Sequence, residues 1–376
     1  TAIRLAMSGL KVLIVEQKRF PREKLCGEFI SPECLPIFDE LGIKDEILSG
    51  TGTPIQRTVF YAATGRSVSI ASKWFASGSA AMGLSRAAMD AALLLRARSV
   101  GVTVLEETTA VGLVTENKRV IGLALRSPDE KCDVLSHLTI DATGRSRVLA
   151  RQIEKARHVA RPRGKFVAFK AHLSGAEISP ESCEIYAYKG GYGGCIGVEG
   201  GLHNLCFIVS TTAAKEHNSN AGDLVRNIVM KNRRASQSLK KFSVNGNWLA
   251  VPIEQYGRFD LAPTHGLLSV GDAAAFMDPF TGSGILIALQ NSAVVTTSIL
   301  DYFQAAPGAR TFELLGSDYR ARYAKIFGKR LRMASLLRRA AFLPGLAELI
   351  VQGLALNESI TRYIARATRS ADPTSE

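Results

Sequence analysis

Residues 267–293, LLSVGDAAAFMDPFTGSGILIALQNSA, run from an apolar strand through an irregular loop into a helix. The positions that mark this pattern are Gly271, Asp272, Pro279, Gly282 and Gly284. A carboxylate at the end of a strand can hold a sugar or ribityl hydroxyl. Closely spaced glycines let backbone N–H groups approach a planar or anionic ligand at a helix N-terminus. The segment predicts a ligand-binding strand–loop–helix unit, and a purely structural strand-to-helix turn is the alternative.

The first residues, TAIRLAMSGLKVLIVEQ, predict a helix over 1–7 that stops at Gly9, followed by a buried parallel strand over 12–15. Glu16 closes that strand. A strand that follows a helix and ends in an acid is typical of the second half of a dinucleotide-binding βαβ unit, where the acid binds a ribose hydroxyl pair. No GxGxxG turn stands before Thr1. We therefore expect an amino-terminal truncation of that unit.

Length and cysteine usage bound the class of protein. With 376 residues, 46% of them hydrophobic, the chain exceeds one ordinary domain and predicts two lobes. Its six cysteines form no CxxC pair, so we expect no metal site, reduced thiols and a cytoplasmic protein. The longest apolar stretches, near 284–300 and 340–356, are interrupted by polar residues or proline, which argues against membrane spans.

The order of elements predicts an α/β fold in which a Rossmann-like nucleotide lobe is interrupted by a β-sheet substrate lobe and followed by helices. A hairpin is expected over 58–70, a helix from Arg86, a mainly antiparallel sheet within 164–210 and a single helix over 224–242. The expected division is 1–57, 82–160 and 262–300 for the nucleotide lobe, 58–81 and 161–261 for the substrate lobe, and 301–376 for a basic helical segment.

The net charge of +13 is concentrated near the C-terminus. Residues 320–370 hold eleven Lys or Arg and two Glu, a net charge of +9, with leucines interleaved among Arg332, Arg338 and Arg339. This pattern suits either a helical cap with its basic side in water or peripheral contact with an anionic membrane. No nucleic-acid-binding motif accompanies the charge, so nucleic acid is not an expected partner. None of these patterns specifies an oligomeric state.

The spacing of the 267–293 segment closely resembles the second flavin fingerprint of the p-hydroxybenzoate hydroxylase-type FAD enzymes. Three further pieces follow the order of that family: the strand ending in Glu16, the segment LSRAAMD with Arg86, and DATGRSR with Asp141 and Gly144. Ala142 stands where many members have glycine. The resemblance implies FAD as cofactor, NAD(P)H as reductant, and cofactor contacts at Glu16, Arg86, Asp141, Gly144, Gly271, Asp272, Pro279, Gly282 and Gly284.

The segment FPREKLCGEF resembles the K-x-C-G segment of the geranylgeranyl reductase-like branch. The resemblance implies that Cys26 lies beside the isoalloxazine ring as a catalytic thiol; a buried, inert cysteine is the alternative. Glycines and Cys195 replace the tryptophan expected in the substrate strand of that branch, and a missing WxWxIP pattern argues against a flavin-dependent halogenase.

Three functions follow from these observations. In the first, reduced FAD delivers hydride to an alkene of a lipophilic small molecule. In the second, reduced FAD captures oxygen and hydroxylates an aromatic or polyketide-like ring. In the third, the chain is a non-catalytic protein that keeps the fold as a binding surface. His172, His203 and His265 are isolated in the sequence, so we expect structural roles for them.

Overall fold

The structure is a computed structural model that describes residues 1–50, 52–75, 80–156, 164–253, 256–276, 282–306, 311–341 and 346–367, with the backbone alone for 337–341 and 346–347. Its helices are α1 (Ala2–Met7), α2 (Cys34–Leu41), α3 (Lys44–Ser49), α4 (Arg86–Ser99), α5 (Ala150–Ala156), α6 (Thr211–Glu216), α7 (Ala221–Asn227), α8 (Arg233–Ser238), α9 (Gly284–Gln304), α10 (Phe312–Ala341), α11 (Leu346–Leu356) and α12 (Glu358–Ala367), with short 3₁₀ turns η1 (Ser72–Trp74), η2 (Gly144–Ser146), η3 (Glu199–Gly201), η4 (Val229–Lys231) and η5 (Gly271–Ala273). Its strands are β1 (Leu13–Val15), β2 (Phe29–Ile30), β3 (Thr53–Ile55), β4 (Arg57–Tyr61), β5 (Ser67–Ala71), β6 (Ala81–Gly83), β7 (Thr103–Leu105), β8 (Thr109–Glu116), β9 (Arg119–Arg126), β10 (Lys131–Leu135), β11 (Thr139–Asp141), β12 (Phe166–Ser174), β13 (Ser182–Tyr188), β14 (Gly191–Gly197), β15 (His203–Ser210), β16 (Ser243–Ile253), β17 (Gly257–Arg258), β18 (Leu267–Ser269) and β19 (Ala275–Phe276).

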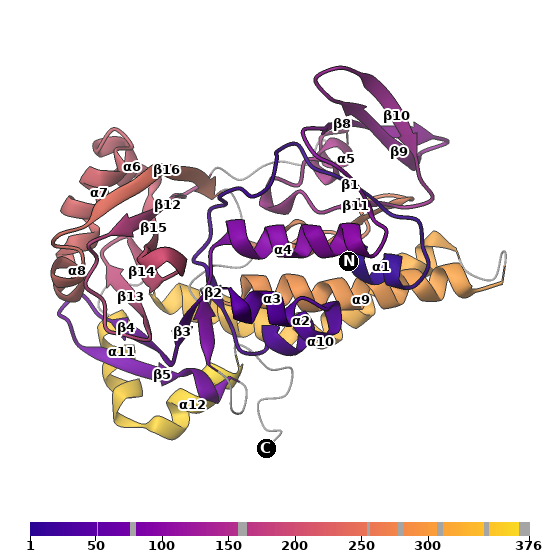
Figure 1. The fold of residues 1–376 in the computed structure, drawn as a ribbon. Helices are drawn as coiled ribbons and strands as arrows, with labels where there is room; N and C mark the ends of the chain where they lie inside the picture. Colours follow the sequence, from indigo (N-terminus) through magenta and orange to yellow (C-terminus); the bar gives the residue numbers. More distant parts are fainter. Residues whose placement is uncertain are drawn as a thin grey trace.

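One part of the molecule is built from two parallel strand pairs covered by helices (Figure 1). β1 pairs with β7 and β11 pairs with β18. Helices α1, α4 and α9 contribute buried side chains around these pairs, including Leu5, Met89 and Val295. Because parallel pairs need helical crossovers, the chain leaves and re-enters this part several times. The arrangement confirms the predicted α/β fold class and the predicted opening helix and strand.

The second part is a seven-stranded sheet in the order β16-β12-β15-β14-β13-β4-β5, formed from residues 57–71 and 166–253. All its strand pairs are antiparallel except β13 with β4. Helices α6, α7 and α8 cover one face, and buried residues such as Leu224, Phe207 and Tyr186 form the core between them (Figure 1). The other face of the sheet turns toward the first part of the molecule. The predicted hairpin over 58–70 is confirmed as β4 and β5, with Gly65 in the left-handed region.

The single helix expected over 224–242 is wrong. The chain forms α7, the turn η4 and α8, and Asn232 begins α8. The buried Asn232 side chain accepts hydrogen bonds from the N–H groups of Arg234 and Ala235 and donates to the carbonyls of Tyr61, Ala62 and Ala187. The Asn232 side chain thus pairs backbone groups both at the start of α8 and in the neighbouring strands. These hydrogen bonds favour a break at Asn232 over the continuous helix that the sequence pattern predicts.

We expect Asn232→Ala to lower the free energy of unfolding by about 2 kcal/mol, because several buried backbone groups lose their partner at once. Asn220→Ala is the matched control, because Asn220 caps α7 through one hydrogen bond to Asp223 at an exposed position. The control should cost about 1 kcal/mol or less. Urea unfolding of both variants measures the difference, and equal losses would contradict the role given to Asn232.

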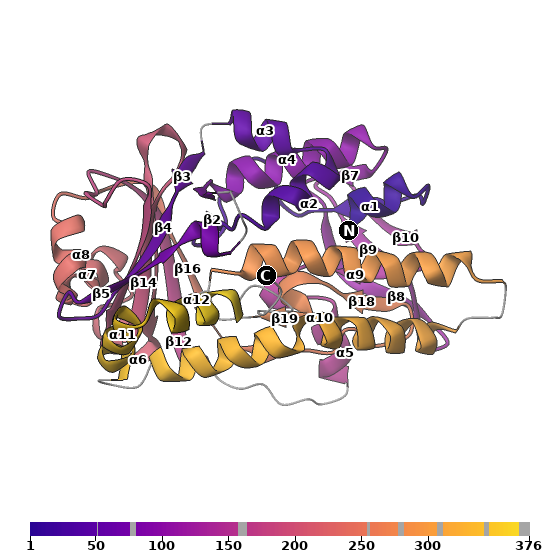
Figure 2. The ribbon, with the colours of Figure 1, turned by 90° about the horizontal axis from the view of Figure 1, so that it is seen from below.

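The C-terminal helices run along the underside of the molecule (Figure 2). α10 packs on α9 through the buried Tyr319, Tyr323 and Phe327, and α11 and α12 pack on β5 and η1. Among the described residues, α9 is the one helix long and apolar enough to cross a membrane, but 56% of its most apolar window is buried inside the fold. It therefore has the burial of a core helix. Arg338 and Arg339 lie where the structure describes the backbone alone.

Candidate functional site

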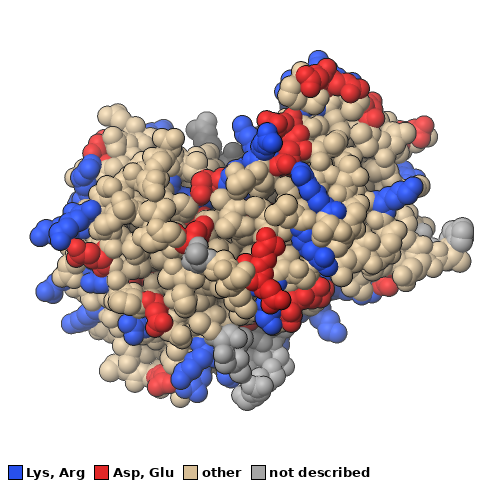
Figure 3. Space-filling view, viewed as in Figure 1, with Lys and Arg blue, Asp and Glu red and all other residues tan. Residues whose placement is uncertain are grey.

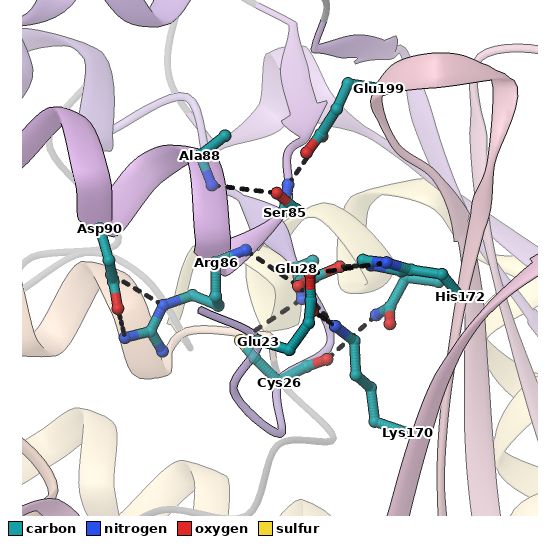
Figure 4. Close-up of polar contacts among 11 residues, drawn as sticks. Glu23, Cys26, Glu28, Ser85, Arg86, Ala88, Asp90, Lys170, His172 and Glu199 are labelled. Carbon is teal, nitrogen blue, oxygen red and sulfur yellow. Dashed lines mark hydrogen bonds and ion pairs between the residues drawn. The ribbon is translucent and has the colours of Figure 1, made fainter. Parts of the chain in front are cut away.

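The loop between β1 and β2 leads into the small sheet β2-β6-β3 and carries Cys26 (Figure 4). The Cys26 carbonyl accepts a hydrogen bond from the Asn204 side chain at 3.0 Å, and its thiol sulfur accepts one from the Glu28 N–H at 3.4 Å. Glu28 has a φ of 57°. A non-glycine residue rarely takes this conformation, so surrounding contacts must hold it. The thiol is therefore placed by a fixed loop.

Those contacts come from a group that we call the Glu28 cluster: Glu23, Glu28, Lys170 and His172 (Figure 4). Glu28 is fully buried, and its Oε1 accepts from the Lys170 ammonium at 3.0 Å and from the Arg86 backbone N–H at 2.9 Å. Its Oε2 lies 2.7 Å from His172 Nε2. Lys170 also forms an ion pair with Glu23. Every oxygen of the buried carboxylate is thus engaged, as a buried charge requires.

The sheet register explains why these side chains meet. Lys170 on β12 lies opposite Cys206 on β15, and His172 lies opposite Asn204. Residues directly opposite on neighbouring strands share one face of a sheet, so all four side chains face the Cys26 loop. Burial raises the pKa of the Cys206 thiol to about 12. Cys206 is therefore a neutral member of this polar strip.

Glu23, Glu28 and His172 lie close enough to one another to hold a metal ion. However, the Lys170 ammonium contacts both carboxylates and occupies the position that a cation would take. The arrangement of these described residues is that of a charge-balanced cluster, and we assign no metal to it.

Arg86, the first residue of α4, lies beside Cys26 and forms a two-pronged ion pair with Asp90 at 2.8 and 3.0 Å. The Ser85 hydroxyl caps the helix by accepting from Ala88, which confirms the predicted helix start. Burial alone would lower the pKa of Arg86, but Asp90 and the Cys26 thiol outweigh it and raise the pKa. Lys24 adds a second ion pair to Asp90 at 2.6 Å. A permanent positive charge therefore stands next to the thiol.

Asp272 follows β18 as predicted, and burial raises the pKa of its carboxyl against the opposing effects of Arg86 and Arg145. Asp272 has no hydrogen bond from the described residues. Arg145 likewise has none among them; its guanidinium lies 5.9 Å from the Phe276 ring centre, and burial lowers its pKa. Gly271 and Gly282 have φ values of 57° and 60°, which explains glycine there. Pro279 lies outside the described residues, and Gly284 begins α9.

The three remaining predicted cofactor residues that the structure describes are Glu16, Asp141 and Gly144. Glu16 follows β1, accepts from the Lys18 N–H at 3.0 Å and pairs with Arg22 at 3.3 Å. Asp141 is fully buried, and its carboxylate accepts from the Thr143 N–H and hydroxyl and from the Ala150 N–H. The Asp141 carboxylate therefore joins the turn at Thr143 to the start of α5. Gly144 has a φ of 67° and open space beside its Cα.

An apolar wall continues the same sheet face beyond the polar strip. Its members are Leu25, Ala168, Tyr192, Ile208 and Phe276, which pack in one cluster. The ring of Tyr256 stacks on Phe276 with 5.3 Å between ring centres. Tyr186 and Tyr188 point to the opposite, helix-covered face. The site therefore has a polar side at Cys26 and an apolar side at this wall.

The sequence analysis missed Glu28, Lys170 and Asn204 and treated His172 as isolated. The signal was weak: a Lys-x-His pair on a strand indicates only that both side chains share one face. Glu28 lies more than 140 residues from Lys170 and His172 in the sequence. No local spacing predicts such a contact.

A family model described as "FAD binding domain" matches residues 1–310. The chain belongs to this FAD-binding family. The digeranylgeranylglycerophospholipid reductase of Methanosarcina acetivorans is 25% identical over 338 residues, covering 89% of this chain and 79% of that protein. A protein of the same name from Methanosarcina mazei is 26% identical over 291 residues, covering 76% of this chain and 68% of that protein. The chain is therefore an FAD-dependent oxidoreductase.

Solved structures share the fold. The flavin-dependent brominase Bmp2 superposes with a TM-score of 0.80 at 18% identity, covering 99% of this chain and 90% of that chain. A geranylgeranyl bacteriochlorophyll reductase-like protein from Thermoplasma acidophilum superposes with a TM-score of 0.71 at 19% identity, covering 100% of this chain and 89% of that chain. Identities this low support the shared architecture alone.

The residues around Asp272 fit FAD. A partly buried carboxylate without a hydrogen-bond donor from the described residues suits a ribityl hydroxyl, and the left-handed glycines bring backbone close to a ligand. Arg145 offers a guanidinium without a hydrogen bond to the described chain. Asp272, Arg145, Arg86 and Cys26 interact electrostatically with one another, so these four side chains lie in one region of the molecule.

Proposed function

We propose that this enzyme reduces carbon–carbon double bonds in a lipophilic, isoprenoid-like small molecule. The observation that carries the proposal is the position of the Cys26 thiol, which is fixed beside the Arg86 guanidinium at the junction of a polar strip and an apolar wall. An amphipathic substrate matches such a site. The names of the two Methanosarcina reductases, which refer to lipids with geranylgeranyl chains, support the same substrate class.

When bound, FAD in its reduced form would supply the hydride for one alkene carbon, and NAD(P)H is the proposed source of its electrons. The other alkene carbon needs a proton, and we propose the Cys26 S–H group as its donor. The thiolate that remains is stabilised by the positive charge of Arg86. Asn204 and Glu28 hold the loop during this transfer. All six cysteines are free thiols, so Cys26 keeps the S–H bond that this step uses.

The test is turnover of a phospholipid carrying geranylgeranyl chains by the FAD-loaded enzyme, reduced chemically without oxygen. Each reduced double bond adds two hydrogen atoms to the product mass. We expect this product without oxygen and less of it in air, because oxygen consumes the reduced cofactor. Product that forms only in air and contains an added oxygen atom would instead identify a monooxygenase and overturn the proposal.

We expect Cys26→Ala to lower the turnover number for alkene reduction by about 10²-fold, because a positioned proton donor typically contributes this much. The visible flavin spectrum and the unfolding midpoint should stay close to those of the parent. Cys132→Ala is the matched control, since Cys132 is an exposed free thiol on β10. If Cys26→Ala kept the full turnover number, Cys26 would be an inert cysteine and not the proton donor.

A further inference from the structure

We propose that the outer face of α11 and α12 is a docking surface for an anionic lipid membrane. The face consists of four exposed apolar side chains: Leu349 at 64%, Leu356 at 88%, Ile360 at 50% and Tyr363 at 51% exposure. The described chain has fourteen large apolar side chains with comparable exposure, and four of them lie within this one short segment. Isolated exposed leucines are ordinary, but a concentration of them marks an interaction surface. The inference does not depend on the proposed reaction.

The packing of α11 shows why its leucines stay outside. Val351 is buried and Leu354 packs beside it against Ala62 and Val68 of the β4–β5 hairpin. Leu349 and Leu356 are seven residues apart, two turns of helix, and so lie on one side of α11, away from that contact. The helix therefore uses one apolar side for the fold and presents a second to the outside.

The same division holds for α12. Thr361 and Ala365 are buried, whereas Ile360 and Tyr363 are exposed and three residues apart on the other side. Arg362 lies over the Trp74 ring with 5.4 Å to its centre, and Arg366 donates to the Trp74 carbonyl at 3.4 Å. Apolar side chains flanked by arginines and an amphipathic aromatic ring are typical of helices that lie in a membrane interface.

The charge of the residues around this surface indicates which partner it binds. Glu348 pairs with Arg66 and Glu358 pairs with Arg362, so the two acids of the segment are neutralised. The exposed Lys73 and the neighbouring Arg366 then leave this surface with a net positive charge. In Figure 3 the lower left of the molecule, where Figure 1 places α8 and α11, carries Lys and Arg side chains with Asp and Glu side chains among them. An apolar face inside a basic field fits anionic lipid headgroups above an apolar layer. A second copy of this chain would bring the same positive charge against itself.

The experiment is co-sedimentation of the FAD-loaded protein with vesicles of phosphatidylcholine, with and without phosphatidylglycerol. We expect binding to the anionic vesicles that weakens as salt is raised. Leu349→Ser combined with Leu356→Ser should weaken this binding at least about tenfold, because both side chains insert into the lipid. Lys73→Gln should weaken it about fivefold at low salt. These positions are exposed, so the variants should fold like the parent.

Matched controls are Leu95→Ser combined with Leu135→Ser, and Lys131→Gln, which change equally exposed residues on α4 and β10. We expect parental binding from both. The proposal is overturned if the parent does not bind anionic vesicles, or if the α11 variant binds like its control. It is also overturned if the parent is a dimer in solution that the α11 variant converts to a monomer, since the face would then be a self-association interface.

Discussion

Replacing Glu28 with Gln is expected to lower the free energy of unfolding by about 3–5 kcal/mol, the typical cost of removing one partner from a buried ion pair. Glu28 is fully buried and holds Lys170, which is itself 1% exposed, together with His172 and the Arg86 N–H. Glutamine keeps the shape of the side chain but not its charge. The Lys170 ammonium would then remain buried with Glu23 as its remaining carboxylate partner.

Glu23→Gln is the matched control for this prediction. Glu23 contacts the same ammonium, but its side chain is 42% exposed, so solvent compensates for the lost charge. We expect a cost of about 1 kcal/mol or less. Urea unfolding followed by circular dichroism measures both variants. If the two substitutions cost the same, the Glu28 cluster does not hold the Cys26 loop in the way we describe.

Asp272→Asn is expected to weaken FAD binding about tenfold to a hundredfold, because hydrogen bonds to a charged group contribute about 1.5–3 kcal/mol. The same substitution should make the FAD-free protein more stable at neutral pH. Burial raises the pKa of the Asp272 carboxyl, so the folded protein binds the proton more tightly than the unfolded chain does. The stability contributed by the neutral carboxyl is therefore lost as the pH rises from the ordinary aspartate pKa through the raised one.

Fluorescence titration with FAD and urea unfolding between acid and neutral pH test both parts of the Asp272 prediction. Asp260→Asn is the matched control, since Asp260 is 45% exposed and pairs with Arg320 on α10. We expect this control to bind FAD like the parent. An Asp272→Asn variant that binds FAD equally well would remove Asp272 from the cofactor site, whatever its stability.

The elements near the cofactor were predicted from local patterns, because their causes are local. A run of apolar β-branched residues makes β1, the Ser85 hydroxyl starts α4, and a left-handed glycine ends or turns a segment wherever it stands. The helix over 224–242 failed for a non-local reason. The helix is interrupted at Asn232, whose side chain instead donates hydrogen bonds to backbone carbonyls in and next to strands β4 and β13.

The sequence by itself determined the α/β class, the helix that begins at Arg86 and the strand that ends just before Asp272, because motif spacing and periodicity encode local structure over short stretches. Only the tertiary structure decided that Cys26 lies beside Arg86, that Asp141 accepts from the Ala150 N–H at the start of α5, and that Glu28 holds Lys170 and His172. These contacts join residues from separate elements of the chain. Their partners are chosen by strand register and by the cost of burying an unpaired charge, which no local pattern specifies.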